Sequence, residues 1–171
     1  ERLVLHLHKQ GHRNIGFAGL EERPLWSLER YAGFLHAAKE LGLQTPPGWM
    51  INAIEPAVKD SQLDEPVLEA TRQGVTAWAC VSDGLAHRLY CIFKNAGLRV
   101  PEDVSITGFD GIKRLKDCPA LTTMEVPWKE MGEGALAAII ERIHNPSATA
   151  VHREYMGKFV RGKSTAPPRE D

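Results

Sequence analysis

The 171-residue sequence has little of what marks the specialised protein classes. Its three cysteines are odd in number and form no C-x-x-C pair, which is typical of reduced thiols in a cytosol. The longest strongly apolar run, residues 135–140, is far too short to span a bilayer. The formal net charge of -1 excludes a generally basic nucleic-acid-binding surface on this chain. We therefore expect a cytoplasmic globular protein without a membrane partner.

Motifs of the common enzyme and metal-binding classes are also missing. There is no G-x-S-x-G, no Walker loop and no H-E-x-x-H pattern. The G-E-G sequence at 132–134 loosely resembles a dinucleotide fingerprint, but it lies inside a helix that begins at Pro127, without the required strand-to-helix turn. His8 and His12 are four residues apart, yet no carboxylate completes a metal-ligand set. We expect no catalytic residue, no cofactor and no metal site.

What the sequence does contain is an alternation of apolar β-type runs and amphipathic helical patterns. Strands are expected at 14–19, 49–54, 75–81, 104–109, 122–126 and 153–160, and helices at 2–10, 26–41, 61–74, 83–96 and 127–143. This alternation predicts right-handed crossovers and a parallel sheet with helices on both faces, which is an α/β fold. The length of the chain corresponds to about one domain.

Ligands of such a sheet bind beyond the carboxyl ends of its strands, so we look there for functional polar groups. Asp110 directly follows an expected strand, where its carboxylate either accepts hydrogen bonds from ligand hydroxyls or stabilises its own turn. Ser82 and Asp83 follow another strand and either contact a ligand or cap the next helix. These two roles are compatible.

Arg30 and two tryptophans complete the set of candidate ligand-binding residues. Arg30 lies about one turn into a helix, and its guanidinium offers five donors that suit vicinal hydroxyls, carboxylates or phosphates, although a helical arginine more often forms a surface salt bridge. Trp26 and Trp128 stand at helix starts, where an aromatic face over a ligand ring is the alternative to a core anchor. Trp49 and Trp78 are interpreted as core residues of strands.

Six motifs occur in order across nearly the whole chain. They are G-H-R-N-I-G-F-A-G at 11–19, R-Y-A-G-F at 30–34, A-C-V-S-D-G-L-A at 79–86, V-P-E-D-V-S-I-T-G-F-D at 100–110, P-A-L-T-T at 119–123 and R-G-K-S-T-A-P-P at 161–168. Together they resemble the C-terminal effector-binding domain of the lactose/galactose-repressor (LacI/GalR) family of transcriptional regulators. The resemblance implies a periplasmic-binding-protein-like fold of type I, in which two α/β subdomains close on a small molecule, usually a sugar or nucleobase derivative.

Motif positions make Arg30, Asp110, Ser82 and Trp128 similar to the effector-contacting residues of the family, and we add Trp26 from its place at a helix start. Ser82 replaces an Asn of the family pattern and Gly111 replaces a common second Asp, so the identity of a sugar does not transfer.

The resemblance also implies a division of the chain. Residues 1–121 would form the C-terminal subdomain, 122–149 a strand and helix of the N-terminal subdomain, 150–163 the return, and 164–171 a loose tail. A DNA-binding head and most of the N-terminal subdomain would precede residue 1. The apolar face of helix 127–143 would then lack a partner, so we expect this chain alone to self-associate or to fold that helix back.

The expected function is therefore the effector-sensing and dimerising part of a transcriptional regulator, with repression as its expected mode. It would bind a sugar-like small molecule, form a homodimer, and reach DNA only through a domain absent from this chain. One alternative is a transport-associated sugar-binding protein of the same fold. Another is an α/β enzyme, for which Asp83 and Asp110 are the available acids.

Overall fold

A computed structural model describes residues 1–20, 25–53, 61–113 and 115–169. The helices are α1 (Arg2–Lys9), α2 (Leu25–Glu40), α3 (Ser61–Arg72), α4 (Asp83–Asn95) and α5 (Trp128–His144), with a one-turn helix η1 (Pro47–Trp49). The strands are β1 (Ile15–Leu20), β2 (Met50–Ala53), β3 (Ala77–Cys80), β4 (Ser105–Asp110), β5 (Thr122–Glu125) and β6 (Lys158–Val160). Helices and strands alternate up to β4, as the sequence pattern predicted.

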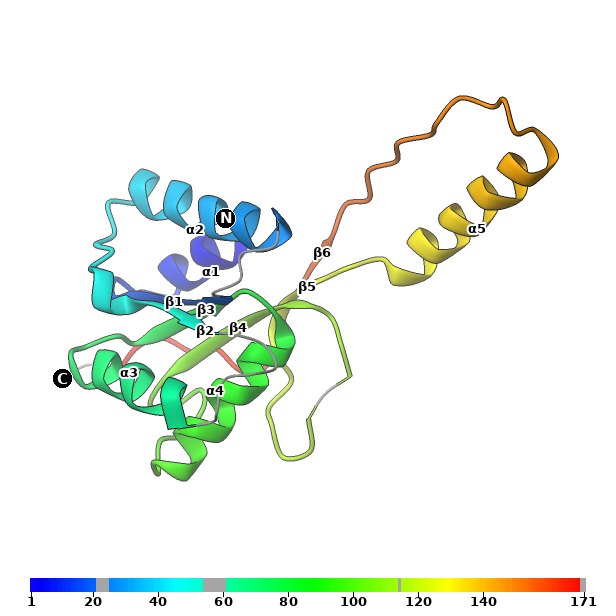
Figure 1. Cartoon of the computed structure of the whole chain (residues 1–171). Helices are drawn as coiled ribbons and strands as arrows, with labels where there is room; N and C mark the ends of the chain where they lie inside the picture. Colours follow the sequence, from blue (N-terminus) through cyan, green and yellow to red (C-terminus); the bar gives the residue numbers. More distant parts are fainter. Residues whose placement is uncertain (21–24, 54–60, 114, 170–171) are drawn as a thin grey trace.

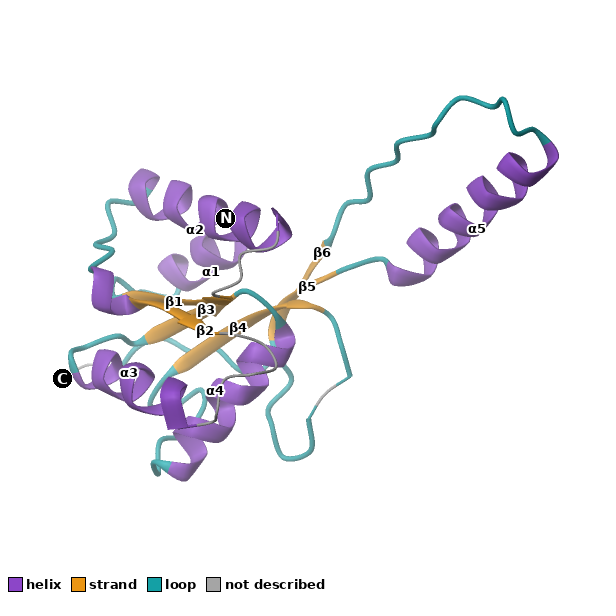
Figure 2. Ribbon diagram, in the orientation of Figure 1, coloured by secondary structure: helices purple, strands orange, loops and turns teal. Residues whose placement is uncertain are grey.

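The strands form one six-stranded sheet in the order β2-β1-β3-β4-β5-β6. The first five are mutually parallel, with α1 and α2 on one face and α3 and α4 on the other (Figure 1, Figure 2). The α/β prediction is thus confirmed. The strand expected at 153–160 is wrong in length, since only its last three residues pair in the sheet, and β6 runs antiparallel to β5. Among the described residues, no helix combines the length and apolarity needed to cross a bilayer.

The core lies on both faces of β1, β3 and β4, which explains the continuously apolar character of these strands. Trp78 is fully buried and lies against Gly16 on the neighbouring strand. A Cβ atom at Gly16 would approach the Trp78 ring to 2.7 Å, so the indole occupies space that only a glycine leaves. Trp49 is buried as well, and the interpretation of both residues as core is confirmed.

A long arm, residues 126–157, projects from the rest of the molecule, which we call the body (Figure 1). The arm consists of α5 and the segment that returns from it to β6. Tyr155 of the returning segment crosses α5 at Gly134, where a Cβ atom would collide with its hydroxyl. The opposite side of α5 exposes large apolar side chains, and α5 does not fold back onto the body. Self-association of this chain stays a prediction.

The prediction of a loose tail at 164–171 is wrong for the tail residues that the structure describes. Ser164 is fully buried, and its Oγ donates to the Ile106 carbonyl at 2.6 Å and accepts from the Thr122 amide at 2.9 Å. Further along, the Ala166 carbonyl lies 2.8 Å from Nε2 of the buried His12. The tail is ordered because its hydroxyl and carbonyl groups satisfy buried polar groups of the body. The division into 1–121, 122–149 and 150–163 stays a prediction.

Candidate functional site

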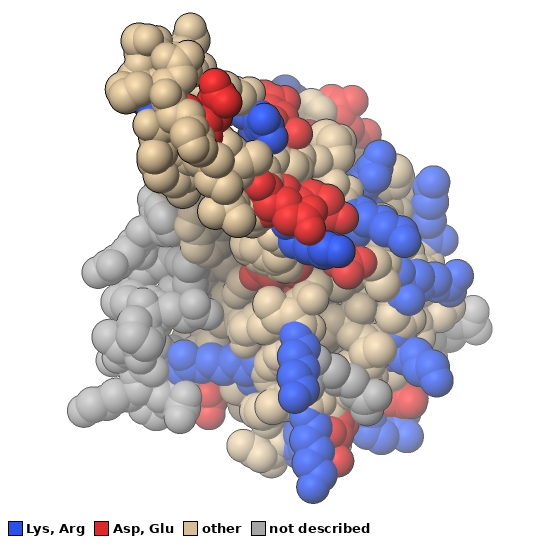
Figure 3. Space-filling view, turned by 90° about the vertical axis from the view of Figure 1, so that its right-hand side faces the viewer, with Lys and Arg blue, Asp and Glu red and all other residues tan. Residues whose placement is uncertain are grey.

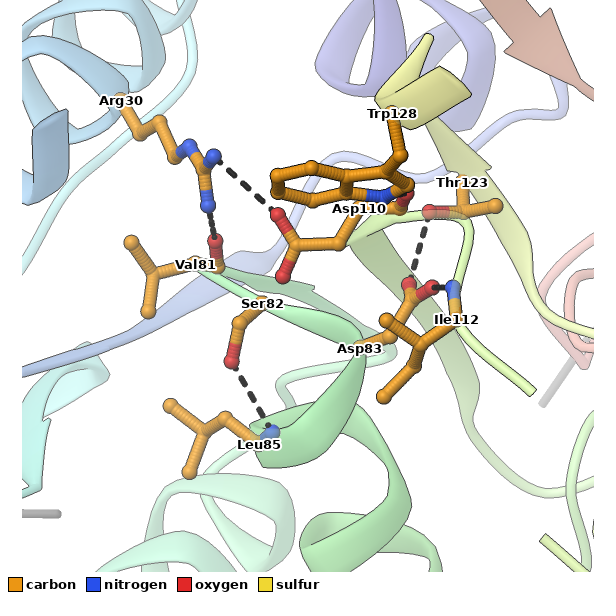
Figure 4. A network of polar contacts seen from close by, with 9 residues as sticks. All are labelled: Arg30, Val81, Ser82, Asp83, Leu85, Asp110, Ile112, Thr123 and Trp128. Atoms are coloured by element: carbon orange, nitrogen blue, oxygen red, sulfur yellow. Dashed lines mark hydrogen bonds and ion pairs between the residues drawn. The ribbon is translucent and has the colours of Figure 1, made fainter. Parts of the chain in front are cut away.

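Two of the predicted site residues meet at the carboxyl ends of the strands. Asp110 is the last residue of β4, and Arg30 reaches it from the second turn of α2 (Figure 4). The Arg30 Nη2 and Asp110 Oδ1 atoms are 3.2 Å apart, and both side chains are about one-fifth exposed. These two residues lie 80 positions apart in the sequence, and the fold brings their side chains together.

The guanidinium of Arg30 is held on several sides. Its Nη1 donates to the Val81 carbonyl at 2.7 Å, and its carbon lies 3.7 Å from the Phe109 ring centre and 4.6 Å from that of Trp26. Contacts at these distances with aromatic faces are attractive for a cation. Burial lowers the pKa of Arg30, while Asp110 opposes this, and an arginine remains charged in either case. Trp26 thus contacts the candidate site through Arg30 and does not anchor the core.

The backbone of Asp110 is as constrained as its side chain. Its φ is +125°, a region that residues other than glycine rarely occupy. Its carbonyl accepts hydrogen bonds from the Val126 amide at 3.1 Å and from the indole Nε1 of Trp128 at 2.9 Å. Trp128 therefore lies beside Asp110 and contacts its backbone, while its place beside an effector stays a prediction.

Ser82 and Asp83 serve the fold at this edge. The Ser82 Oγ accepts from the Leu85 amide at 3.1 Å, which confirms the capping role for the start of α4. The buried Asp83 carboxylate accepts from the Thr123 hydroxyl at 2.7 Å and from the Ile112 amide at 2.9 Å (Figure 4). Asp83 thereby ties α4, β5 and the loop after β4 together.

Gly108 makes the position of Asp83 possible, since a Cβ atom at Gly108 would collide with the Asp83 carboxylate. Sequence reasoning missed this role, as it missed Phe109 under the guanidinium. The available signal for Phe109 was its place immediately before Asp110 at a strand end. Within the described part of the chain, no cluster of three or more His, Cys, Asp or Glu could hold a metal ion.

A cavity of about 490 Å³ adjoins Arg30 on the sheet face that α1 and α2 cover. Its walls are mainly apolar and include Leu3, Phe17, Phe34, Phe109 and Met124. Arg30 and Trp26 line this cavity, whereas Asp110, Ser82 and Trp128 do not. Arg30 and Trp26 thus belong to both the cavity and the candidate site.

The family model and the curated relatives that match this chain agree on its family. Residues 4–165 match the family model of a periplasmic binding protein-like domain. The HTH-type transcriptional repressor PurR of Pectobacterium carotovorum subsp. carotovorum (strain PC1) is 35% identical over 164 residues, which cover 94% of this chain and 47% of that protein. The PurR repressor of Klebsiella pneumoniae (strain 342) is 32% identical with the same coverage. The chain spans about half the length of the curated relatives it matches.

Solved structures agree with this match. A transcription regulator from Lactobacillus plantarum superimposes with a TM-score of 0.84 and 26% identity, covering 97% of this chain and 63% of that one. A LacI family transcriptional regulator from Enterococcus faecium with bound ribose gives a TM-score of 0.78 and 27% identity, covering 98% of this chain and 62% of that one.

Proposed function

This chain belongs to the periplasmic binding protein-like domain family, and from that premise we propose that it is the effector-binding part of a LacI-type transcriptional repressor. The curated relatives are repressors about twice as long as the matched region, which supports a DNA-binding domain elsewhere in the whole protein. In this proposal the regulator acts in the cytoplasm as a homodimer. This chain itself contacts neither DNA nor a membrane.

The observation that carries the proposal is the Arg30–Asp110 pair at the carboxyl ends of β1, β3 and β4. It offers a fork of donors beside a carboxylate acceptor, which suits the neighbouring hydroxyl groups of a sugar. The Ser82 hydroxyl, which accepts one hydrogen bond as a cap, keeps its own hydrogen for a ligand. Trp26 and Trp128 supply aromatic faces beside the pair. The bound ribose of the Enterococcus faecium regulator supports a sugar-like effector.

The effector would act by closing two lobes. Residues 1–121 and 150–163 form one lobe in this proposal, and 122–149 belong to a second lobe that lies mainly outside this chain. The exposed apolar side of α5 supports this division, because such a surface normally packs against a partner. A ligand that bridges the lobes shifts the protein toward its closed state by the difference between its affinities for the two states.

We propose no catalytic step for this site. The two acids at the strand ends are engaged in the fold, Asp83 with Thr123 and Ile112, and Asp110 with Arg30. The names of the curated relatives favour the regulator over the transport-associated sugar-binding alternative.

A thermal-shift screen of the full-length protein against D-ribose, other sugars, sugar phosphates and nucleobases tests the proposal. We expect at least one compound to raise the melting temperature. Arg30→Ala and Asp110→Ala should each weaken binding about 10- to 100-fold, since each removes hydrogen bonds to a charged group. Arg72→Ala, which removes two exposed ion pairs on α3, is the matched control and should respond like the parent. Equal responses of all three variants would overturn the proposed site.

A further inference from the structure

The indole of Trp128 makes a contact that its exposure does not explain. As the first residue of α5, Trp128 stands where the arm leaves the body, and its side chain remains 54% exposed. Its Nε1 nevertheless donates a hydrogen bond of 2.9 Å to the carbonyl of Asp110 (Figure 4). Burial of the ring therefore contributes little here, and the directional N–H···O bond is the specific part of the contact.

The acceptor belongs to a strained and tightly held residue. Asp110 has a φ of +125°, which costs free energy in a residue with a side chain and persists only where neighbours hold it. Val126, the first arm residue, donates its amide to the same carbonyl at 3.1 Å. Gly111 lies so close to β5 that a Cβ atom would approach Glu125 to 2.7 Å. The root of the arm is thus fixed to the backbone of Asp110.

Asp110 therefore contacts two different parts of the molecule. Its carboxylate pairs with Arg30 in the body, and its carbonyl holds Val126 and Trp128 of the arm. A change in the direction of α5 that moves the indole away breaks one of these bonds and loosens the backbone that positions the carboxylate. On the other side of Asp110, the Asp83 carboxylate accepts from the amide of Ile112 and so holds the loop that follows β4.

We propose that Trp128 is a positioning residue whose indole N–H latches α5 to the backbone of Asp110 and so couples the direction of the arm to the effector-binding carboxylate. If Trp128 only contacted a ligand through its ring, phenylalanine could replace it. The latch needs the N–H donor. The link to the effector rests on the function proposed above, whereas the latch itself does not.

Distance measurements by double electron–electron resonance on the full-length protein test the latch without any ligand. One spin label occupies the exposed native Cys91 on α4, and a second occupies Glu141→Cys on α5, while Cys80 and Cys118 are buried. Trp128→Phe keeps an aromatic ring without a hydrogen-bond donor, and Trp128→Tyr carries its hydroxyl donor at a different place from the indole Nε1. Both should broaden or shift the distance distribution. Lys129→Ala, which removes only the exposed pair with Glu133, should leave it unchanged. A distribution that is identical in the parent and both Trp128 variants would overturn the latch.

Titration with D-ribose, or with the compound that the screen selects, tests the coupling separately. Loss of one hydrogen bond should raise the apparent Kd of the Trp128→Phe protein about 2- to 10-fold. Asp110→Ala should weaken binding of the compound about 10- to 100-fold but keep the distance distribution of the unliganded parent, because the backbone carbonyl remains. If no compound binds the parent while the Trp128 variants still loosen the arm, the effector proposal fails and the latch stands.

Discussion

α4 and α5 are both amphipathic helices, but they bury very different fractions of their apolar side chains. On α4, Leu85, Leu89 and Phe93 are fully buried against the sheet. On α5, Leu136, Ile139 and Ile143 are 57 to 71% exposed, and the buried residue among its 17 is Gly134. An apolar stripe on a helix indicates a packing surface in both cases. The body thus contains the partner of α4, whereas the described residues contain none that covers this side of α5.

The surface of the molecule shows the same contrast. Charged side chains of both signs are spread over most of the face seen in Figure 3, and the projection at its upper left carries fewer of them. We therefore expect the free energy of unfolding to depend mainly on residues of the body, and contacts with other protein surfaces to depend on the arm. Substitutions in the two regions should separate these contributions.

The largest effect is expected in the body at Trp78. Trp78→Ala removes a fully buried indole that packs on Gly16 and donates to Thr71, and it should lower the free energy of unfolding by about 3–5 kcal/mol. Urea denaturation followed by circular dichroism measures this. Ile143→Ala, at a well-exposed position of the arm, is the control and should change stability by less than about 0.5 kcal/mol. Similar losses in both variants would mean that α5 is packed in solution.

The tail offers a second, smaller test of the body. Ser164→Ala leaves the buried Thr122 amide and Ile106 carbonyl without the hydroxyl that each contacts, which should cost about 1–3 kcal/mol. Ser147→Ala in the arm removes an exposed hydroxyl that donates to Asn145, and it should be nearly neutral. A neutral Ser164→Ala would restore the earlier prediction of a loose tail.

We expect the free energy of unfolding to depend on pH through His12, with an effect smaller than that of Ser164→Ala. Burial lowers the pKa of His12 below 6.5, with the neighbouring His6 acting in the same direction and the bond to the Ala166 carbonyl opposing. The unfolded chain therefore binds a proton more readily than the native one. The contribution of neutral, buried His12 to the free energy of unfolding is therefore complete above pH 6.5 and is lost as the pH falls below that value. His12→Asn should flatten the dependence of stability on pH between 5 and 7, and an unchanged slope in that variant would contradict the assignment.

The sequence pattern predicted the helices and strands of the body well, because these elements depend mainly on residues that are close together in the sequence. The Ser82 cap, the alternation of apolar strands with helices, and the meeting of Arg30 and Asp110 at the strand ends all follow from short segments and one topological rule. The order of the tail could not be predicted in this way. It depends on contacts such as that between Ser164 and Ile106, which lie 58 positions apart in the sequence.

The same limit explains what was missed in the site. Phe109 lies against Arg30, although the two residues are 79 positions apart in the sequence. The Trp128 indole donates to a backbone carbonyl, which every residue has, so the residue types could not predict this contact. The motif position of Trp128 implied a place beside the effector, which stays a prediction, and the atoms that Trp128 and Phe109 use became visible only in three dimensions.

The smallest effect on stability, and the sharpest test of the comparison, is expected on the exposed side of α5. The double substitution Leu136→Ser and Ile139→Ser should change the free energy of unfolding of the 171-residue chain by less than about 1 kcal/mol, since neither side chain is buried. It should nevertheless weaken self-association of that chain at least about tenfold, because burying a large apolar side chain contributes about 1.5–3 kcal/mol. Sedimentation velocity over a range of concentrations, together with binding of an apolar dye, measures this. A parent chain that stays monomeric and binds no dye would show that the side of α5 needs no partner, and the contrast between the two helices would lose its meaning.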